Sequence, residues 1–291
     1  MKDIVEKKGK TNLLEGKLLA NVFFEPSTRT RCSFEAAMKR LGGDVVNISK
    51  SGSSAKKGET LQDTLRCLAC YTDTIVLRHP EKGSAAFVSK YLDKPLLNAG
   101  DGAGEHPTQA LLDLYTIVSE LKLKEPKDIH VALVGDLKYG RTVHSLVQLL
   151  ALYSGIRLSY VAPDALQMPE YVKSAVTSIA SNATSDGYIA PIQKVYHSVD
   201  DIIDTADVLY VTRIQKERFE DPKEYEKHQG TFVITKATAE RMKPASVIMH
   251  PLPRVGEILE EVDDNPRAGY FRQMKNGMFS RMALLALVNG K

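Results

Sequence analysis

We predict an α/β protein made of two doubly wound parallel-sheet domains, with the active site in the crevice between them. Its 291 residues, 43% of them hydrophobic, exceed the length at which a single core usually keeps growing. Short runs of β-branched and apolar residues alternate with longer segments of helical period, which is the pattern of parallel sheets with crossover helices. Polar and charged residues follow the ends of those runs, where open α/β sheets bind their ligands.

The first set of elements is expected to form a domain over residues 1–125. Its strands are expected at 20–24, 45–49, 74–78 and 95–99. Its helices are expected at 29–41, 59–71, 84–92 and 107–121. Gly42 and Gly43 stop the first of these helices, and Pro107 suits the first position of the last one.

A second domain is expected over residues 126–265, after the polar connector 122–126. Its strands are expected at 129–135, 157–162, 207–212 and 246–250, with a weakly marked stretch at 192–196. Helices are expected near 141–153 and after Pro169. Residues 266–291 carry a further helical segment, which we expect to pack back on the first domain.

The charge and hydropathy exclude two classes of partner. The net charge of +3 is small, and Lys and Arg are interspersed with Asp and Glu, which gives no reason to expect nucleic acid. The longest wholly apolar stretch, 283–288, is far shorter than the roughly 20 residues that cross a bilayer. The amino terminus has no secretory hydrophobic region, so we expect a soluble cytoplasmic protein with no membrane partner.

Three cysteines, Cys32, Cys67 and Cys70, are an odd number that argues against a disulfide framework. Cys67 and Cys70 could form a redox pair or half of a zinc site, but no second cysteine pair or nearby histidine completes one. Their helical spacing with Leu65 and Leu68 favours buried packing. No metal-ligand set is found elsewhere, and no metal is expected.

A phosphate site is predicted where strand 20–24 meets the next helix. The segment after the strand contains Ser27, Thr28, Arg29 and Thr30. Free backbone N–H groups, hydroxyls and a guanidinium at a helix N-terminus suit a bound phosphate. Simple helix capping is the alternative, but one hydroxyl worth about 1 kcal/mol is enough for that and leaves Arg29 unexplained.

Other polar residues of the first domain follow its remaining strands. The loop 50–58 is basic and could clamp an anion, although a solvated surface loop is the commoner meaning of such a composition. Arg78 ends the third strand, and His106 and Gln109 stand at the first turn of the helix after the fourth. A histidine there is often a cap or a packed residue; beside a phosphate it could donate to a phosphoryl or carbonyl oxygen.

The second domain offers two arginines at strand ends. The segment 135–142 resembles a Walker A loop in spacing, but Arg141 replaces its lysine, and no strand ending in a magnesium-binding aspartate is convincing. An arginine there is better suited to a carboxylate. Arg213 and Gln215 follow strand 207–212, so the two guanidiniums suggest a dicarboxylate; surface ion pairs are the alternative.

The last strand runs into a turn with two prolines, Pro251 and Pro253. Prolines lack a backbone N–H, so the carbonyls are the polar groups that remain, and they can accept hydrogen bonds from an amide NH₂. A cis bond before Pro253 is plausible.

Six motifs together resemble the aspartate carbamoyltransferase family. They are FEPSTRTR at 24–31, KKGE at 56–59, RHP at 78–80, HPTQ at 106–109, GDLKYGRTVH at 135–144 and HPLPR at 250–254. Their order matches that family, and the resemblance covers residues 19–288. It implies transfer of the carbamoyl group of carbamoyl phosphate to the amino group of L-aspartate, giving N-carbamoyl-L-aspartate and phosphate, an early step of pyrimidine synthesis.

The resemblance also implies residue roles. Residues 1–125 would form the carbamoyl phosphate-binding domain, and the residues that contact this substrate would be Ser27, Thr28, Arg29, Thr30, Ser53, Lys57, Arg78, His106, Gln109, and Pro251 and Leu252 of the second domain. Residues 126–265 would bind aspartate, whose ligands would be Lys57, Arg141, Arg213, Gln215 and Leu252. The catalytic set would be Arg29, Thr30, Lys57, Arg78 and His106. In that family the positions of Ser53 and Lys57 enter a neighbouring subunit's site, which implies a homotrimer with shared sites.

The implied mechanism needs no cofactor, metal or nucleotide. Carbamoyl phosphate binds first, the neutral amine of aspartate attacks its carbonyl carbon, and phosphate leaves with the amine's proton. Ornithine carbamoyltransferase is the nearest competitor, but it would carry a cysteine in the last turn, and Arg213 with Gln215 suits an anionic side chain. A binding module that keeps the fold without activity is a further alternative.

The start of the chain departs from the family, which usually has an additional helix before the first strand. Only about 18 residues precede that strand here. A truncated start is one interpretation, in which Lys7-Lys8-Gly9-Lys10 could be a linker remnant. A piece of a larger multifunctional pyrimidine-synthesis protein is one hypothesis.

Overall fold

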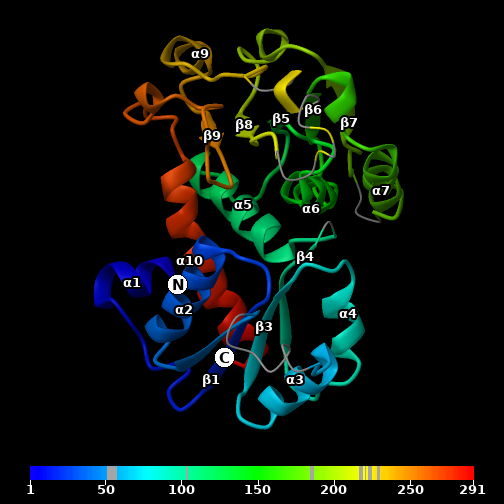
Figure 1. Cartoon of the computed structure of the whole chain (residues 1–291). Helices are drawn as coiled ribbons and strands as arrows, with labels where there is room; N and C mark the ends of the chain where they lie inside the picture. The colour runs from blue at the N-terminus through cyan, green and yellow to red at the C-terminus, as the bar shows by residue number, and fades with distance from the viewer. Residues whose placement is uncertain are drawn as a thin grey trace. The chain divides into compact units, whose positions relative to one another are not determined.

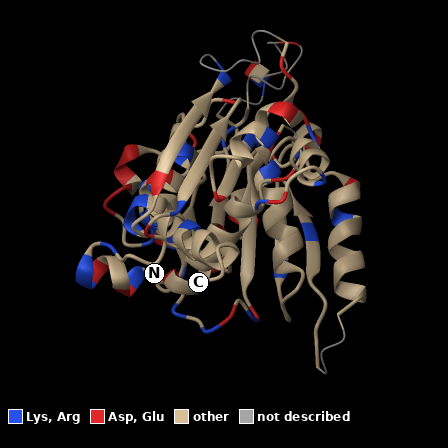
Figure 2. Ribbon diagram, turned by 90° about the horizontal axis from the view of Figure 1, so that it is seen from below, with Lys and Arg blue, Asp and Glu red and all other residues tan. Residues whose placement is uncertain are grey.

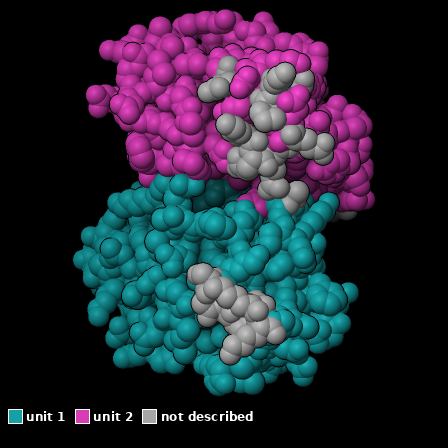
Figure 3. Space-filling model, in the orientation of Figure 1, with its two compact units in different colours: residues 1–112, 274–291 teal, residues 113–273 magenta. Residues whose placement is uncertain are grey.

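The computed structural model divides the chain into two compact units, Met1–Leu112 with Met274–Lys291, and Asp113–Gln273 (Figure 3). It describes residues 1–50, 58–102, 104–183, 187–215, 219, 221, 225–227 and 230–291. The domain boundaries expected at 125 and 265 stay a prediction. Among the described residues, no helix is both long and apolar enough to cross a membrane.

The first unit holds a four-stranded parallel sheet in the order β2-β1-β3-β4 (Figure 1). The strands are β1 Leu18–Phe23, β2 Asp44–Ser49, β3 Thr74–His79 and β4 Leu96–Asp101. The helices are α1 Lys2–Lys8, α2 Thr28–Arg40, α3 Leu61–Ala69, α4 Ser84–Ser89, the start of α5 Pro107–Glu120 and most of α10 Tyr270–Val288. All four expected strands form, with ends shifted by one or two residues.

Two apolar layers cover this sheet, because successive side chains of a strand point to opposite faces. Ala20, Val22 and Leu77 pack with α3 and α4 on one face. Helix α10 lies beside α2, where Arg281 donates to Ser33 Oγ over 3.0 Å and covers the ring of Phe34. The segment 274–291 therefore belongs to the core of the first unit.

The second unit holds a five-stranded parallel sheet in the order β7-β6-β5-β8-β9. Its strands are β5 His130–Val134, β6 Arg157–Val161, β7 Ile192–Tyr196, β8 Val208–Val211 and β9 Val247–Met249. Its helices include α6 Arg141–Leu150, α7 Glu170–Ser181 and α9 Lys236–Arg241. The predicted class, two parallel α/β sheets, is confirmed, and the weakly marked stretch 192–196 is the edge strand β7.

The second sheet also alternates between two cores. Val131 and Leu133 of β5 pack with α6 and α7, whereas Ala132 and Val134 pack with Ile203 and Ala239 on the other face. Every residue of β5 is buried, which is why this central strand reads as a continuous apolar run. Lys and Arg are interspersed with Asp and Glu along the surface elements (Figure 2).

One expectation about the first unit is wrong, that for the cysteines of α3. Cys67 and Cys70 are exposed, because the buried face of α3 carries Thr64, Leu65 and Ala69 and the cysteines lie off it. The segment before Lys10 is a helix, α1. Its cap residue Gly9 accepts a hydrogen bond from the side chain of Arg40 on α2.

Candidate functional site

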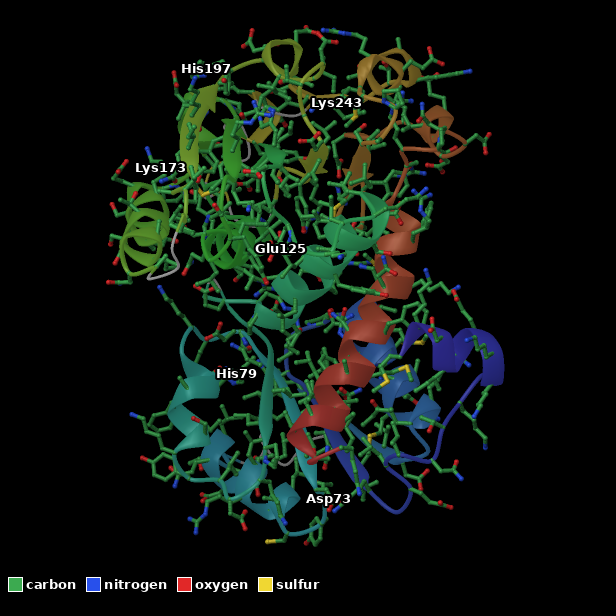
Figure 4. All side chains as sticks on the ribbon, turned by 180° about the vertical axis from the view of Figure 1, so that it is seen from behind. Asp73, His79, Glu125, Lys173, His197 and Lys243 are labelled. Atoms are coloured by element: carbon green, nitrogen blue, oxygen red, sulfur yellow. The ribbon has the colours of Figure 1, made fainter. Side chains whose placement is uncertain are left out.

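The two ends of the strands carry different chemistry, as Asp73 and His79 at opposite ends of β3 illustrate (Figure 4). At the amino end, Asp73 accepts from Lys17 Nζ over 2.8 Å and from the amide of Leu18 over 2.9 Å, which ties β3 to β1. At the carboxyl end, Arg78 and the residues after β1 lie side by side, since Phe23 pairs with Arg78 in the sheet. The candidate site residues belong to this carboxyl end.

The segment 27–30 opens α2 as predicted. Ser27 is the N-cap residue, with φ −161° and ψ 93°, but its hydroxyl makes no capping hydrogen bond. The capping alternative therefore does not account for Ser27. Thr30 is buried, while Thr28 and Arg29 are exposed at the first turn, where the backbone N–H groups of the helix have no intrahelical partner. The arrangement suits a bound anion.

Arg78 is the centre of a buried cluster in the first unit. It is 7% exposed, donates from Nη1 to the carbonyl of Ala99 over 3.1 Å, and donates from Nη2 to Glu25 Oε1 over 2.9 Å. His106 Nε2 lies 3.5 Å from Arg78 Nη1. Because the carbonyl and the carboxylate fix its guanidinium, Arg78 cannot swing freely, and its charge is preorganised beside His106.

The loop between β4 and α5 supplies His106, and the first turn of α5 supplies Gln109. Both are buried, at 4% and 6% exposure, and the amide of Gln109 donates to the carbonyl of His106 over 2.9 Å in the first turn of α5. The structure therefore brings Arg78 and His106 together, with Gln109 one turn further along the helix. Ser53 and Lys57 lie outside the described residues.

In the second unit, Asp136 holds two strand ends together. It is fully buried, and its carboxylate accepts from the amide of Tyr139 over 2.9 Å and from that of Gln215 over 3.3 Å. Burial raises the pKa of this carboxyl, and the amide donors offset only part of that effect. Gly135 has φ +112°, and a Cβ there would stand 2.2 Å from the carbonyl oxygen of Thr212, so only glycine fits this crossing.

A cavity of about 190 Å³ lies beside these strand ends. Arg213 lines it, together with Gly135, Thr212 and Glu257. A space of this size holds a small polar molecule, and a guanidinium on its wall suits a carboxylate. Arg141, the first residue of α6, is not among the described residues that line the cavity. The backbone amide of Gln215 donates to Asp136, the neighbour of Gly135 on the cavity wall.

The turn after β9 is closed by the side chains of His250 and Glu257. The amide of Leu252 donates to His250 Nδ1 over 2.8 Å, which fixes the ring proton on Nε2, because an amide can only donate. That Nε2–H donates to Glu257 Oε1 over 2.6 Å, and Glu257 Oε2 accepts from the amide of Val255 over 2.8 Å. Leu252 is held at φ 56°, and the bond before Pro253 is cis.

Glu257 should make stability depend on pH. Burial raises the pKa of its carboxyl, but the hydrogen bonds from His250 and from Val255 outweigh burial and leave that pKa below its ordinary 4.5. A lowered folded-state pKa stabilises the fold above pH 4.5 and loses that contribution as the pH falls through the folded value.

We therefore expect Glu257→Gln to lower the free energy of unfolding by about 2 kcal/mol at pH 7. The difference from wild type should shrink below pH 4.5. Urea unfolding at a series of pH values measures both quantities. A constant difference across that series would contradict the assigned pairing.

Several site residues were not assigned a role from the sequence, namely Glu25, Asp136, His250 and Glu257. The first three directly follow a strand or stand in a quoted motif, so position was the available signal. Glu257 lies outside every motif, and only its contact with His250 identifies it. Among the described residues, no group of three His, Cys, Asp or Glu side chains could hold a metal ion.

Comparison with known proteins gives two family-model matches that together span most of the chain. Residues 1–119 match the carbamoyl-P binding domain of aspartate/ornithine carbamoyltransferase, and residues 127–288 match the Asp/Orn binding domain of the same family. A catalytic subunit of aspartate carbamoyltransferase from Thermoplasma volcanium is 49% identical over 287 residues, which are 98% of this chain and 90% of that one.

Longer relatives and solved structures are also similar. A multifunctional protein of Dictyostelium discoideum is 49% identical over 290 residues, 100% of this chain but 12% of that protein. The chain thus spans about an eighth of such multifunctional relatives. The Trypanosoma cruzi aspartate transcarbamoylase in complex with carbamoyl phosphate has a TM-score of 0.90 at 44% identity, covering 98% of this chain and 88% of that one. The Methanocaldococcus jannaschii catalytic subunit has a TM-score of 0.88 at 47% identity and covers 100% and 92%.

Proposed function

The chain belongs to the aspartate/ornithine carbamoyltransferase family, and we propose that it transfers the carbamoyl group of carbamoyl phosphate to the amino group of L-aspartate. The observation that carries this proposal is the fixed cluster of Arg78 and His106 in the unit that also opens α2 with Ser27–Thr30. That unit offers an anion site next to donors for a carbonyl oxygen. The second unit offers guanidiniums for a dicarboxylate.

Carbamoyl phosphate is assigned to the first of these sets. The N-terminus of α2, with Ser27, Thr28, Arg29 and Thr30, takes the phosphate, and Thr30 is buried enough to be rigid. Arg78 and His106 donate to the carbonyl oxygen or a phosphate oxygen. Gln109 and the carbonyls of Pro251 and Leu252 orient the NH₂ group, and Ser53 and Lys57 complete the set.

Aspartate is assigned to Arg141, Arg213 and Gln215, with Lys57 and Leu252. Arg213 is supported by its place on the wall of the 190 Å³ cavity, and Gln215 by the hydrogen bond that its backbone amide donates to Asp136. Two guanidiniums match two carboxylates, whereas ornithine would bring an ammonium to the same positions. This charge argument favours aspartate over ornithine.

The reaction follows from orientation and charge. The neutral amine of aspartate attacks the carbonyl carbon, forming a C–N bond and an oxyanion, and the positive charge of Arg78 and the donor on His106 stabilise that oxyanion. The C–O bond to phosphate then breaks, the oxyanion returns to a carbonyl, and the departing phosphate takes the amine's proton. Arg29, Thr30, Lys57, Arg78 and His106 form the proposed catalytic set.

Assembly and location belong to the proposal too. We propose a homotrimer in which Ser53 and Lys57 serve a neighbouring subunit's site, acting in pyrimidine synthesis in the cytoplasm. We also propose that this chain is part of a larger multifunctional protein. Two multifunctional relatives support this, since the chain covers 12% of the length of each. Sedimentation of the purified protein measures its oligomeric state. Mixing Lys57→Ala subunits with Arg29→Ala subunits tests whether sites are shared. Activity should return in the mixture, because a shared site can then form that contains neither substitution.

The test of the reaction is product formation from carbamoyl phosphate with aspartate and, separately, with ornithine. We expect N-carbamoyl-aspartate and phosphate in equal amounts, and no carbamoylated ornithine. Turnover with ornithine alone would overturn the substrate assignment. A folded protein that is stabilised by carbamoyl phosphate but turns over neither amine would instead support a binding module.

A further inference from the structure

A buried chain of hydrogen bonds runs from α5 through α10 to the start of the turn 250–254. Asp113 of α5 and Gln273 of α10 are both fully buried. Gln273 Nε2 donates to Asp113 Oδ1 over 2.7 Å, and Gln273 Oε1 accepts from the backbone amide of His250 over 2.9 Å. Tyr210 of β8 donates its hydroxyl to Asp113 Oδ2 over 2.8 Å.

The direction of every bond in this chain is fixed. The amide of His250 can only donate, so the oxygen of Gln273 must face it and the NH₂ of Gln273 must face Asp113. Both oxygens of Asp113 accept, as those of a carboxylate do. A flipped Gln273 would set its oxygen against Asp113 and its NH₂ against the amide of His250. Burial makes such a mismatch costly, so one arrangement is strongly preferred.

The amide of His250 matters because the turn has few donors. Pro251 and Pro253 have no N–H, so the amides of His250, Leu252 and Arg254 are the backbone donors between 250 and 254. Gln273 holds the first and the ring of His250 holds the second. With Leu252 at φ 56°, the intervening carbonyls depend on these two bonds for their direction.

We propose that Asp113 and Gln273 are positioning residues, which touch no substrate but aim the carbonyls of Pro251 and Leu252 at the NH₂ of carbamoyl phosphate. The inference rests on the proposed function. Asp113 orients Gln273, Gln273 fixes the amide of His250, and His250 in turn fixes the amide of Leu252. Side chains of α5 and α10, which are far apart in the sequence, thus help to fix the conformation of the turn 250–254.

A reciprocal pair of substitutions tests the proposal. Gln273→Glu sets two carboxylates face to face and should lower kcat about 100-fold, since a displaced orienting group commonly costs that much. Asp113→Asn combined with Gln273→Glu restores the pairing of donors and acceptors. The new side-chain amide on α5 donates to the new carboxylate on α10, and that carboxylate still accepts from the backbone amide of His250. The double variant should return to within about fivefold of wild type, as coupled partners do.

Two further readouts separate positioning from a structural role. Inhibition by inorganic phosphate should be unchanged in Gln273→Glu, because phosphate binds at the N-terminus of α2. Hydrogen exchange at the amide of His250 should accelerate in that variant and slow again in the double variant. Tyr210→Phe is the matched control: it removes the other bond to Asp113 and should lower the free energy of unfolding without lowering kcat.

If Gln273→Glu does not fold, Gln273→Met serves, because it fills a similar volume and accepts no hydrogen bond from His250. Normal kcat in a folded Gln273→Met would overturn the proposal, as would a double variant that regains stability but not kcat. Wild-type protein without any turnover would refute the proposed function. In that case unchanged exchange at His250 in Gln273→Glu would also refute the hydrogen-bond chain, and accelerated exchange would support it.

Discussion

Arg29→Gln is expected to lower kcat/KM for carbamoyl phosphate about 100- to 1000-fold, the cost of removing one preorganised donor from a developing negative charge. The side chain is exposed at the first turn of α2, on the helix that Ser27 opens. Glutamine is nearly as good a helix former as arginine, so the free energy of unfolding should hardly change. Steady-state kinetics at saturating aspartate, with urea unfolding beside it, measures both.

Arg31 provides the matched control for this prediction. It is exposed like Arg29 and lies two residues further along the same helix. Arg31→Gln removes the same charge from α2 two residues further from the helix N-terminus, so kcat/KM should change by less than about threefold, as for a screened surface charge. Equal losses in the two variants would mean that general electrostatic attraction, and not a specific phosphate contact, explains the effect.

The strands were predictable because a parallel sheet buries both faces of its central strands. The run 129–135 around β5 is almost wholly apolar up to Gly135, and Gly135 itself marks the point where the chain passes against Thr212. Candidate site residues at the carboxyl ends of strands could be proposed the same way, as Arg78 at the end of β3 and Arg213 after β8 were. Helix ends were less predictable: the helix expected to reach 153 ends at Leu150.

The remaining features depend on contacts between distant residues. The cysteines of α3 share the helical period of its leucines, but only the packed structure shows that the buried face is formed by Thr64, Leu65 and Ala69. Asp113 and Gln273 are 160 residues apart and appear in a sequence as ordinary helix residues. Because both side chains are buried, each needs the other as a hydrogen-bond partner. The burial of a polar side chain has no local signal in the sequence.

Arg141→Gln is expected to raise KM for aspartate about 100-fold, because removing one partner of a charge-assisted pair leaves a desolvated carboxylate unmatched. Arg141 starts α6, directly after the loop that Asp136 ties to Gln215. Its guanidinium can hold a carboxylate through two parallel hydrogen bonds, which glutamine cannot reproduce. Initial rates at varied aspartate and saturating carbamoyl phosphate measure KM, while kcat at saturating aspartate should fall much less.

Lys138 is the matched control for Arg141, since it lies in the same loop, is exposed, and has its Nζ 5.2 Å from the ring centroid of Tyr139. Lys138→Gln removes one positive charge three residues away, and KM for aspartate should rise by less than about threefold, as expected of a screened exposed charge. A similar rise in both variants would show that the loop attracts aspartate only by its overall charge. A large rise confined to Arg141→Gln requires a direct contact with the substrate, because both variants remove one positive charge from nearby positions of the chain.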